Sequence, residues 1–356
     1  MDTLPYYLVA GLLALAAVLN PTKKPNPVAW GLAFILITVF VGLRHKIGMD
    51  WNNYLRMTDV IGSGTLFEGF GRAEPAFVIL TWLSAKAGLG VYGVNLVVAV
   101  IFASGLFRFC AKTENPWLGL LVAFPMLVMV VACSASRQAA AIGILMWAVA
   151  GWRDYGVMRR AMLILLASMF HYSAIFLLCF AALELNVPLR TKVMVFLATV
   201  AGTVWLMVAT GGGDYYITTY VTEQSDLAYS PGALQHVLLN AIPAAFVLLG
   251  RRFRERLLPS ALLVNLALFA LLLVPVAFVS SLAAGRLTLY LFPVSIFVFA
   301  ALPGVASAPV SRAIIRTVLA SIFVVICWVW LTFSNSGYAY VPYGNALFMH
   351  QSELHL

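Results

Sequence analysis

The chain contains 356 residues, of which 63% are hydrophobic and only 10% are charged, and its mean hydropathy is +0.96. This composition excludes a soluble globular protein, because the apolar surface exceeds what a single core can bury. The net charge of +9 is not accompanied by a basic ladder interleaved with aromatics, a helix-turn-helix or a zinc-ligand spacing, so we expect no nucleic-acid partner. Basic residues gather instead in short loops between apolar runs, which the positive-inside rule assigns to the cytoplasm.

Repeated apolar runs of roughly 17–25 residues predict helices that cross the membrane. In chain order we expect them near residues 4–19, 28–43, 90–109, 116–133, 136–152, 192–209, 234–250, 261–281, 286–302 and 313–333. They predict an all-α polytopic membrane protein with about 10–12 transmembrane helices and with re-entrant or interfacial segments. No internal repeat or low-complexity linker divides the chain, so residues 1–356 are expected to form a single integral membrane domain.

Two apolar segments do not fit a simple count of crossings. Residues 74–88 are short for a span and favour an interfacial or re-entrant helix. Residues 161–183 form one long run with His171 at its middle, and a single crossing would put the basic loop 189–192 on the wrong side. We therefore expect two half-helices that meet at residues 170–172, with the irregular backbone lining a cavity. The loops 44–74 and 210–233 then share the external face with His171 and with the turns around residues 137 and 286.

The polar residues that interrupt the apolar pattern are the candidate site residues. Residues 42–59 concentrate charge at the mouth of a predicted span, where Arg44 and Asp50 lie close in sequence to the amphipathic rings of Trp51 and Tyr54. These residues predict either part of a site or an interfacial loop with ordinary membrane anchors.

Three candidates lie at the ends or in the middle of apolar runs. Arg137 needs a partner or water at such a position, and Gln138 beside it favours a polar pocket over a guanidinium that reaches for the interface. Arg286, with Tyr290 one turn later, is likewise an arginine beside an apolar run that needs a partner or water. His171 is either a functional residue or a satisfied histidine of the core.

Further candidates come from the loops expected outside. Glu74 either contributes to the site or caps the helix that begins at Pro75. Asp214 follows three consecutive glycines and is near Tyr220, and both belong either to a substrate-facing loop or to an ordinary turn.

Several arginines facing one external cavity indicate a particular class of ligand. Guanidinium groups match phosphate geometry and stay charged. A histidine or carboxylate able to take a proton and aromatic rings suited to sugar faces complete the set, so we expect a phosphorylated amphiphile. The sequence contains no Walker A motif, no HExxH or Cys/His metal-ligand set and no GxSxG elbow, so we expect no ATP, metal or other cofactor.

Five short motifs occur in an order that resembles the EpsG branch of the Wzy-type polysaccharide polymerases. They are GLR…G.DW..Y at Gly42–Tyr54, EPAF at Glu74–Phe77, SxSRQxxA at Ser134–Ala141, FHxSA at Phe170–Ala174 and GRLxxY at Gly285–Tyr290. The resemblance covers roughly residues 28–300. It implies an enzyme of the bacterial inner membrane that joins undecaprenyl-pyrophosphate-linked oligosaccharides on the periplasmic or external face. Membrane lipids and, optionally, a chain-length regulator protein are the other implied partners.

The resemblance and the residue chemistry together predict a metal-independent glycosyl transfer. Arg44, Arg137 and Arg286 are expected to bind the pyrophosphate and to stabilise the charge that grows on it. His171 is the expected general base, with Asp50 as its competitor. The residues expected to contact the rest of the substrate are Trp51, Tyr54, Glu74, Gln138, Asp214, Tyr220 and Tyr290.

Two other functions use the same residue types. A flippase or other transporter of lipid-linked glycans needs the arginines but no base, and a membrane O-acyltransferase acting on glycans also centres on a histidine. Charged residues in the middle of several spans would favour transport, whereas here they cluster at span ends.

Overall fold

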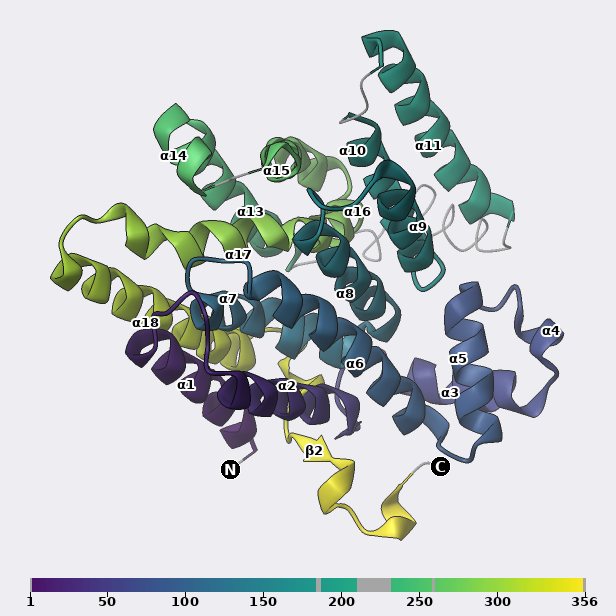
Figure 1. Cartoon of the computed structure of the whole chain (residues 1–356). Coiled ribbons are helices and arrows are strands. Elements are labelled where there is room, and N and C mark those ends of the chain that lie inside the picture. Colours follow the sequence, from purple (N-terminus) through teal and green to yellow (C-terminus); the bar gives the residue numbers. More distant parts are fainter. Residues whose placement is uncertain (1, 184–186, 210–231, 258–259, 355–356) are drawn as a thin grey trace. The chain divides into compact units, whose positions relative to one another are not determined.

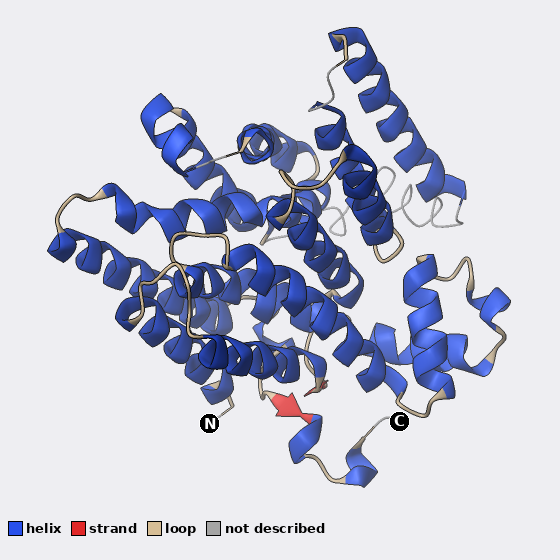
Figure 2. Ribbon diagram, viewed as in Figure 1, coloured by secondary structure: helices blue, strands red, loops and turns tan. Residues whose placement is uncertain are grey.

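The structure is a computed structural model that describes residues 2–183, 187–209, 232–257 and 260–354. Within these ranges the regular structure is helical apart from one short pair of strands (Figure 2). The chain forms two compact units, which we describe separately. Unit 1 comprises Met1–Ala150, Met169–His171 and Ala300–Leu356, and unit 2 comprises Gly151–Ser168 and Tyr172–Phe299.

Unit 1 carries the N-terminal helices and the C-terminal helix (Figure 1). Its N-terminal elements are α1 (Leu4–Leu19), α2 (Pro27–Gly42), β1 (Arg44–His45), α3 (Trp51–Ser63), α4 (Leu66–Gly69), α5 (Pro75–Lys86), α6 (Gly90–Cys110), α7 (Pro116–Ala123), the π-helix η1 (Phe124–Ala132) and α8 (Ser136–Ala150). Its C-terminal elements are η5 (Leu302–Val305), α18 (Pro309–Phe333), η6 (Gly337–Ala339), β2 (Gly344–Asn345), η7 (Ala346–Phe348) and η8 (Gln351–Glu353).

Asn-Pro pairs begin two of these helices. The side chain of Asn26 accepts hydrogen bonds from the backbone N–H groups of Val28 and Ala29 at the start of α2. Asn115 accepts one from Leu118 at the start of α7. Proline follows each cap at the first helical position, where its missing N–H costs no helical hydrogen bond. These starts agree with the expected runs at 28–43 and 116–133.

Glycines let α6 and α8 pack backbone against backbone. A Cβ on Gly105 would collide with the carbonyl of Gly143, and a Cβ on Gly143 would collide with the backbone of Phe102. Small residues at such crossings are how apolar helices approach closely inside a membrane. The close approach holds the start of α8, which carries Ser136 and Arg137, against the neighbouring elements of unit 1.

The C-terminal tail holds the segment that follows α2. β2 pairs antiparallel with β1, with Asn345 opposite Arg44 and Gly344 opposite His45. The Asn345 side chain also donates to the carbonyl of Val39 at 3.2 Å, and Ala346 N donates to the carbonyl of Leu43 at 2.7 Å. The backbone around Arg44 is therefore fixed by residues three hundred positions away in sequence.

Unit 2 contains α9 (Val157–Ser168), the 3-10 helix η2 (Tyr172–Leu177), α10 (Leu178–Leu183), α11 (Leu189–Ala209), α13 (Ala233–Leu248), α14 (Arg251–Leu257), α15 (Ala261–Val279), α16 (Ser281–Thr288) and the 3-10 helix η4 (Leu289–Leu291). The following α17 (Phe292–Ala301) starts in unit 2 and ends at its boundary with unit 1. Because α9 contacts both η2 and α10, the chain turns back on itself near His171. The expected helix break at 170–172 is confirmed.

The all-α polytopic membrane fold predicted from the sequence is confirmed. Four helices of the described chain are long and apolar enough to cross a membrane: Gly90–Cys110, Ala261–Val279, Ala283–Val305 and Pro309–Phe333. Six shorter apolar helices accompany them: Leu4–Leu19, Pro27–Gly42, Pro75–Lys86, Pro116–Ala132, Tyr172–Ala182 and Ala233–Leu248. The expected external loop 44–74 contains α3 and α4. Almost all of the loop 210–233, with Asp214 and Tyr220, lies outside the described residues. The single membrane domain stays a prediction.

Candidate functional site

One buried carboxylate in unit 1 joins two candidate residues from distant parts of the chain. Arg137 Nη1 lies 2.8 Å from Glu74 Oε2, and His171 Nδ1 lies 3.0 Å from Glu74 Oε1. Glu74 is 1% exposed, whereas one third of the Arg137 side chain remains exposed. We call these three residues the Glu74 cluster.

The backbone explains how this cluster forms. Glu74 precedes α5 as its N-cap, in extended conformation and with Pro75 after it, so its side chain is directed out of the helix. Arg137 is the second residue of α8. His171 lies in the break after α9, and Ala76 N donates to the carbonyl of Met169 at 2.9 Å, which ties this break to the start of α5. The starts of α5 and α8 and the segment 169–171 therefore meet at Glu74.

Arg137 and His171 stabilise the negative charge of Glu74. Burial by itself raises the pKa of the Glu74 carboxyl, but the hydrogen bond to His171 and the charge of Arg137 outweigh burial and hold the pKa at about 2. Glu74 is therefore ionised at neutral pH. An ionised carboxylate accepts hydrogen bonds only, so Nδ1 of His171 is the donor and Nε2 is the basic nitrogen of the neutral ring. This arrangement suits a base oriented by a carboxylate.

Two residues of the 42–59 stretch lie next to the Glu74 cluster. The hydroxyl of Tyr54 accepts a hydrogen bond of 3.4 Å from the backbone N–H of Arg137. Its ring packs 5.6 Å from that of Phe77 on α5, so α3 covers the start of α5 and of α8. Asp50 precedes α3, and its backbone N–H donates to the hydroxyl of Ser134 at 3.3 Å. The structure thus brings Asp50 and Tyr54 to the turn that carries Arg137.

A second set of buried polar side chains includes Ser136, the residue that precedes Arg137. Arg44 Nη2 donates to Asn95 Oδ1 at 3.0 Å and to Ser136 Oγ at 2.8 Å, and Arg44 Nη1 donates to the carbonyl of Val41 at 2.8 Å. Ser136 Oγ donates to the same Asn95 oxygen at 3.0 Å. We call Arg44, Asn95 and Ser136 the Arg44 cluster. Arg44 is 1% exposed, and burial lowers the pKa of its guanidinium, so these contacts favour a scaffold role over phosphate binding.

Other candidates of unit 1 are buried. The ring of Trp51 packs 5.8 Å from His45 and 5.9 Å from Tyr92 instead of facing a headgroup zone. Gln138 is also buried, at 5% exposed. Trp51 on α3 and Gln138 on α8 therefore pack inside unit 1. Their expected role in contacting substrate stays a prediction.

In unit 2 two of the sequence motifs meet. The hydroxyls of Tyr290, in η4, and Ser173, in η2, are 2.9 Å apart. Arg286 lies half-buried in α16, one turn before Tyr290. The GRLxxY motif is therefore held against the FHxSA motif by a side-chain hydrogen bond. The pyrophosphate role of Arg286 stays a prediction.

Sequence reasoning did not single out the residues that hold these candidates in place. Asn95 had a detectable signal, since it is an isolated polar residue inside the apolar run 90–109 and such residues usually have partners. Ser136 belongs to the SxSRQxxA motif, but its contact with Arg44 had no signal in the sequence. Tyr340 and Asn345 had none, because their roles depend on contacts between distant segments. Tyr340 accepts a hydrogen bond from Tyr6 at its carbonyl and donates one to the carbonyl of Val130.

Comparison with known proteins adds one finding. The model of the EpsG family matches residues 28–345, which is most of the chain. No curated protein and no solved structure matches. In the part of the chain that the structure describes, no group of three His, Cys, Asp or Glu residues could hold a metal ion.

Proposed function

The chain belongs to the EpsG family, a family associated with exopolysaccharide biosynthesis, and from this premise we propose that it is a polysaccharide polymerase. Its donor is an oligosaccharide repeat unit linked to undecaprenyl pyrophosphate, and its acceptor is a hydroxyl of another repeat unit or growing chain. The reaction takes place on the periplasmic or external face of the inner membrane. The observation that carries the proposal is the Glu74 cluster, in which one carboxylate engages both a cation and an imidazole.

His171 is the general base of this reaction. Its Nδ1 is held by Glu74, so Nε2 takes the proton of the acceptor hydroxyl. The acceptor oxygen forms a bond to the anomeric carbon of the donor, while the bond from that carbon to the pyrophosphate oxygen breaks. Both electrons of the broken bond leave with the undecaprenyl pyrophosphate. Direct displacement of this kind inverts the anomeric centre.

Arg137 stabilises the leaving group. Its Nη1 is bound to Glu74, which fixes the guanidinium, and a third of the side chain is exposed, which leaves one face of the residue open to a ligand. A fixed cation costs no reorganisation as negative charge develops on the pyrophosphate, which is where electrostatic help lowers the barrier most. The expected role of Arg286 at the pyrophosphate stays a prediction from the sequence.

The buried state of Glu74 argues against its direct contact with sugar. At 1% exposure its two oxygens serve His171 and Arg137, so we assign it the orientation of both. Asp50 is the alternative base. It reaches the Arg137 turn through Ser134.

The test uses the purified full-length chain in detergent with lipid-linked repeat units isolated from the producing strain. A polymerase releases undecaprenyl pyrophosphate and yields glycans that grow by whole repeat units, which mass spectrometry resolves. Intact repeat units in the assay, together with their movement across liposome membranes, would instead indicate a flippase. Transfer of an acyl group to the glycan, without release of undecaprenyl pyrophosphate, would indicate an O-acyltransferase.

A further inference from the structure

A hollow of about 390 Å³ lies in unit 1 between α3, the end of α5 and the start of α6. Its α3 side is formed by Leu55, Thr58, Asp59 and Gly62, whose spacing places them on one face of the helix. A helix face packed against two neighbours is normally filled by apolar side chains. Here the same face carries a threonine, a carboxylate and a glycine, and the space remains open.

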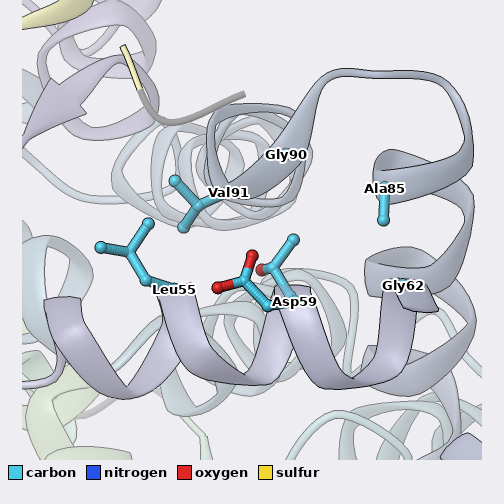
Figure 3. Close-up of a pocket in the computed structure, with 7 residues that line it drawn as sticks. Leu55, Asp59, Gly62, Ala85, Gly90 and Val91 are labelled. Carbon is cyan, nitrogen blue, oxygen red and sulfur yellow. The ribbon is translucent and has the colours of Figure 1, made fainter. Parts of the chain in front are cut away.

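The Asp59 carboxylate is the polar group of this hollow. Figure 3 shows it directed from α3 toward the start of α6, between Leu55 and Gly62. Asp59 is exposed, and among the described residues its side chain makes no hydrogen bond or ion pair. Of the described residues, none that lines the hollow is basic. The site therefore offers an acceptor of hydrogen bonds and repels phosphate and carboxylate groups.

Two apolar side chains stand together on one side of this carboxylate. Leu55 lies on α3 and Val91 on α6, so a ring that donates its hydroxyls to Asp59 has aliphatic surface available for its C–H groups (Figure 3). A lipid tail fits less well, because it would bring hydrocarbon against a polar carboxyl group. The volume falls at the small end of the range of ligand sites.

The hollow is also close to the Glu74 cluster along α3. Tyr54 binds the backbone of Arg137, and Asp59 follows five residues later, about 7.5 Å further along the helix axis. Five residues also turn the helix by about 140°, so the hollow opens on a different face of α3 from the one that carries Tyr54. We propose that the hollow is a saccharide subsite that binds a neutral or amino sugar of the glycan substrate through Asp59. This proposal rests on the proposed polymerase function.

The test measures binding separately from catalysis. Short oligosaccharides without lipid or pyrophosphate are released by mild acid hydrolysis from the polysaccharide of the producing strain. Their binding to the full-length chain in detergent is measured by titration calorimetry. Asp59→Asn keeps the shape and removes the charge, and Leu55→Trp fills the hollow. Val60→Trp is the matched control, because Val60 lies on the same helix, is 46% exposed and does not line the hollow.

We expect the wild type to bind, both subsite variants to bind about tenfold more weakly or worse, and Val60→Trp to bind as the wild type does. A wild type that does not bind overturns the subsite, as does unchanged binding by Asp59→Asn and Leu55→Trp. Binding through Asp59 by a chain that forms no polymer keeps the subsite and refutes the polymerase function. Polymer formation with binding independent of Asp59 refutes the subsite alone.

Discussion

The Glu74 cluster and the Arg44 cluster use the same type of cation at adjoining positions of unit 1, yet they differ in partners and exposure. Arg137 binds a carboxylate and keeps a third of its side chain exposed, whereas Arg44 binds only neutral oxygens and is 1% exposed. Ser136 and Arg137 are neighbours in sequence, and their side chains serve different clusters.

We attribute this difference to separate roles, with the Glu74 cluster as the proposed reacting site and the Arg44 cluster as the scaffold beside it. The buried Arg44 guanidinium donates from its two Nη groups to internal carbonyl, amide and hydroxyl oxygens, so these groups hold neighbouring segments and cannot reach a ligand. A guanidinium paired on one side and exposed on the other can bind an anion. The role of an arginine at the end of an apolar run therefore depends on its partners and not on its position in the sequence.

The largest expected effect is at His171. We expect His171→Ala to lower the rate of glycosyl transfer by about 10²–10⁴ while lipid-linked repeat units still bind, because it removes the general base and leaves Arg137 in place. Polymer length and repeat-unit binding are measured on the same detergent preparation. Asp50→Asn is expected to have a milder effect. Should Asp50→Asn abolish transfer while His171→Ala retains it, the base is Asp50.

A smaller effect is expected for Arg137→Lys. Lysine keeps the charge but loses the planar group that binds Glu74 and an incoming phosphate together, so we expect transfer to fall about 10–100-fold with normal expression. The control is Arg251→Lys, which alters an exposed arginine that pairs with Glu255. Wild-type polymer from Arg137→Lys would contradict the role of Arg137 at the pyrophosphate.

For the Arg44 cluster we expect substitution to lower stability and not the rate of transfer. Arg44→Lys loses hydrogen bonds to Asn95 or Ser136, and we expect about 1.5–3 kcal/mol of lost stability with little change in transfer per folded molecule. Thermal unfolding in detergent measures the stability, and Arg153→Lys, in an exposed turn, is the control. A catalytic loss without a stability loss would move Arg44 into the reacting site.

The smallest effect concerns pH. Because the pKa of Glu74 is lowered from its ordinary value of 4.5 to about 2, its ionised form stabilises the fold above pH 4.5. That contribution is lost as pH falls through 2. We expect Glu74→Gln to be less stable than the wild type at neutral pH, with the difference shrinking between pH 4.5 and 2. A difference in melting temperature that stays constant over this range would place the ionised carboxylate outside the stabilising contacts.

Much of the fold follows from local rules. The apolar runs predicted the helices near 4–19, 28–43, 90–109 and 116–133 to within one or two residues, because a helix end depends on nearby caps such as Asn26 and Asn115. The break at His171 was predicted from the balance of basic loops. No glycine or proline lies between residues 161 and 183, so local backbone chemistry alone would have missed it.

The sequence by itself determined that the chain is a helical membrane protein and which polar residues interrupt its apolar pattern, since composition and period are local properties. Only the tertiary structure decided that Glu74 joins Arg137 to His171, that Arg44 is enclosed by Asn95 and Ser136, and that the C-terminal tail pairs with β1. Each of these contacts joins residues tens to hundreds of positions apart. They form because a buried charge is stable only with a partner, and the partner is supplied by whichever helix end the packing brings beside it.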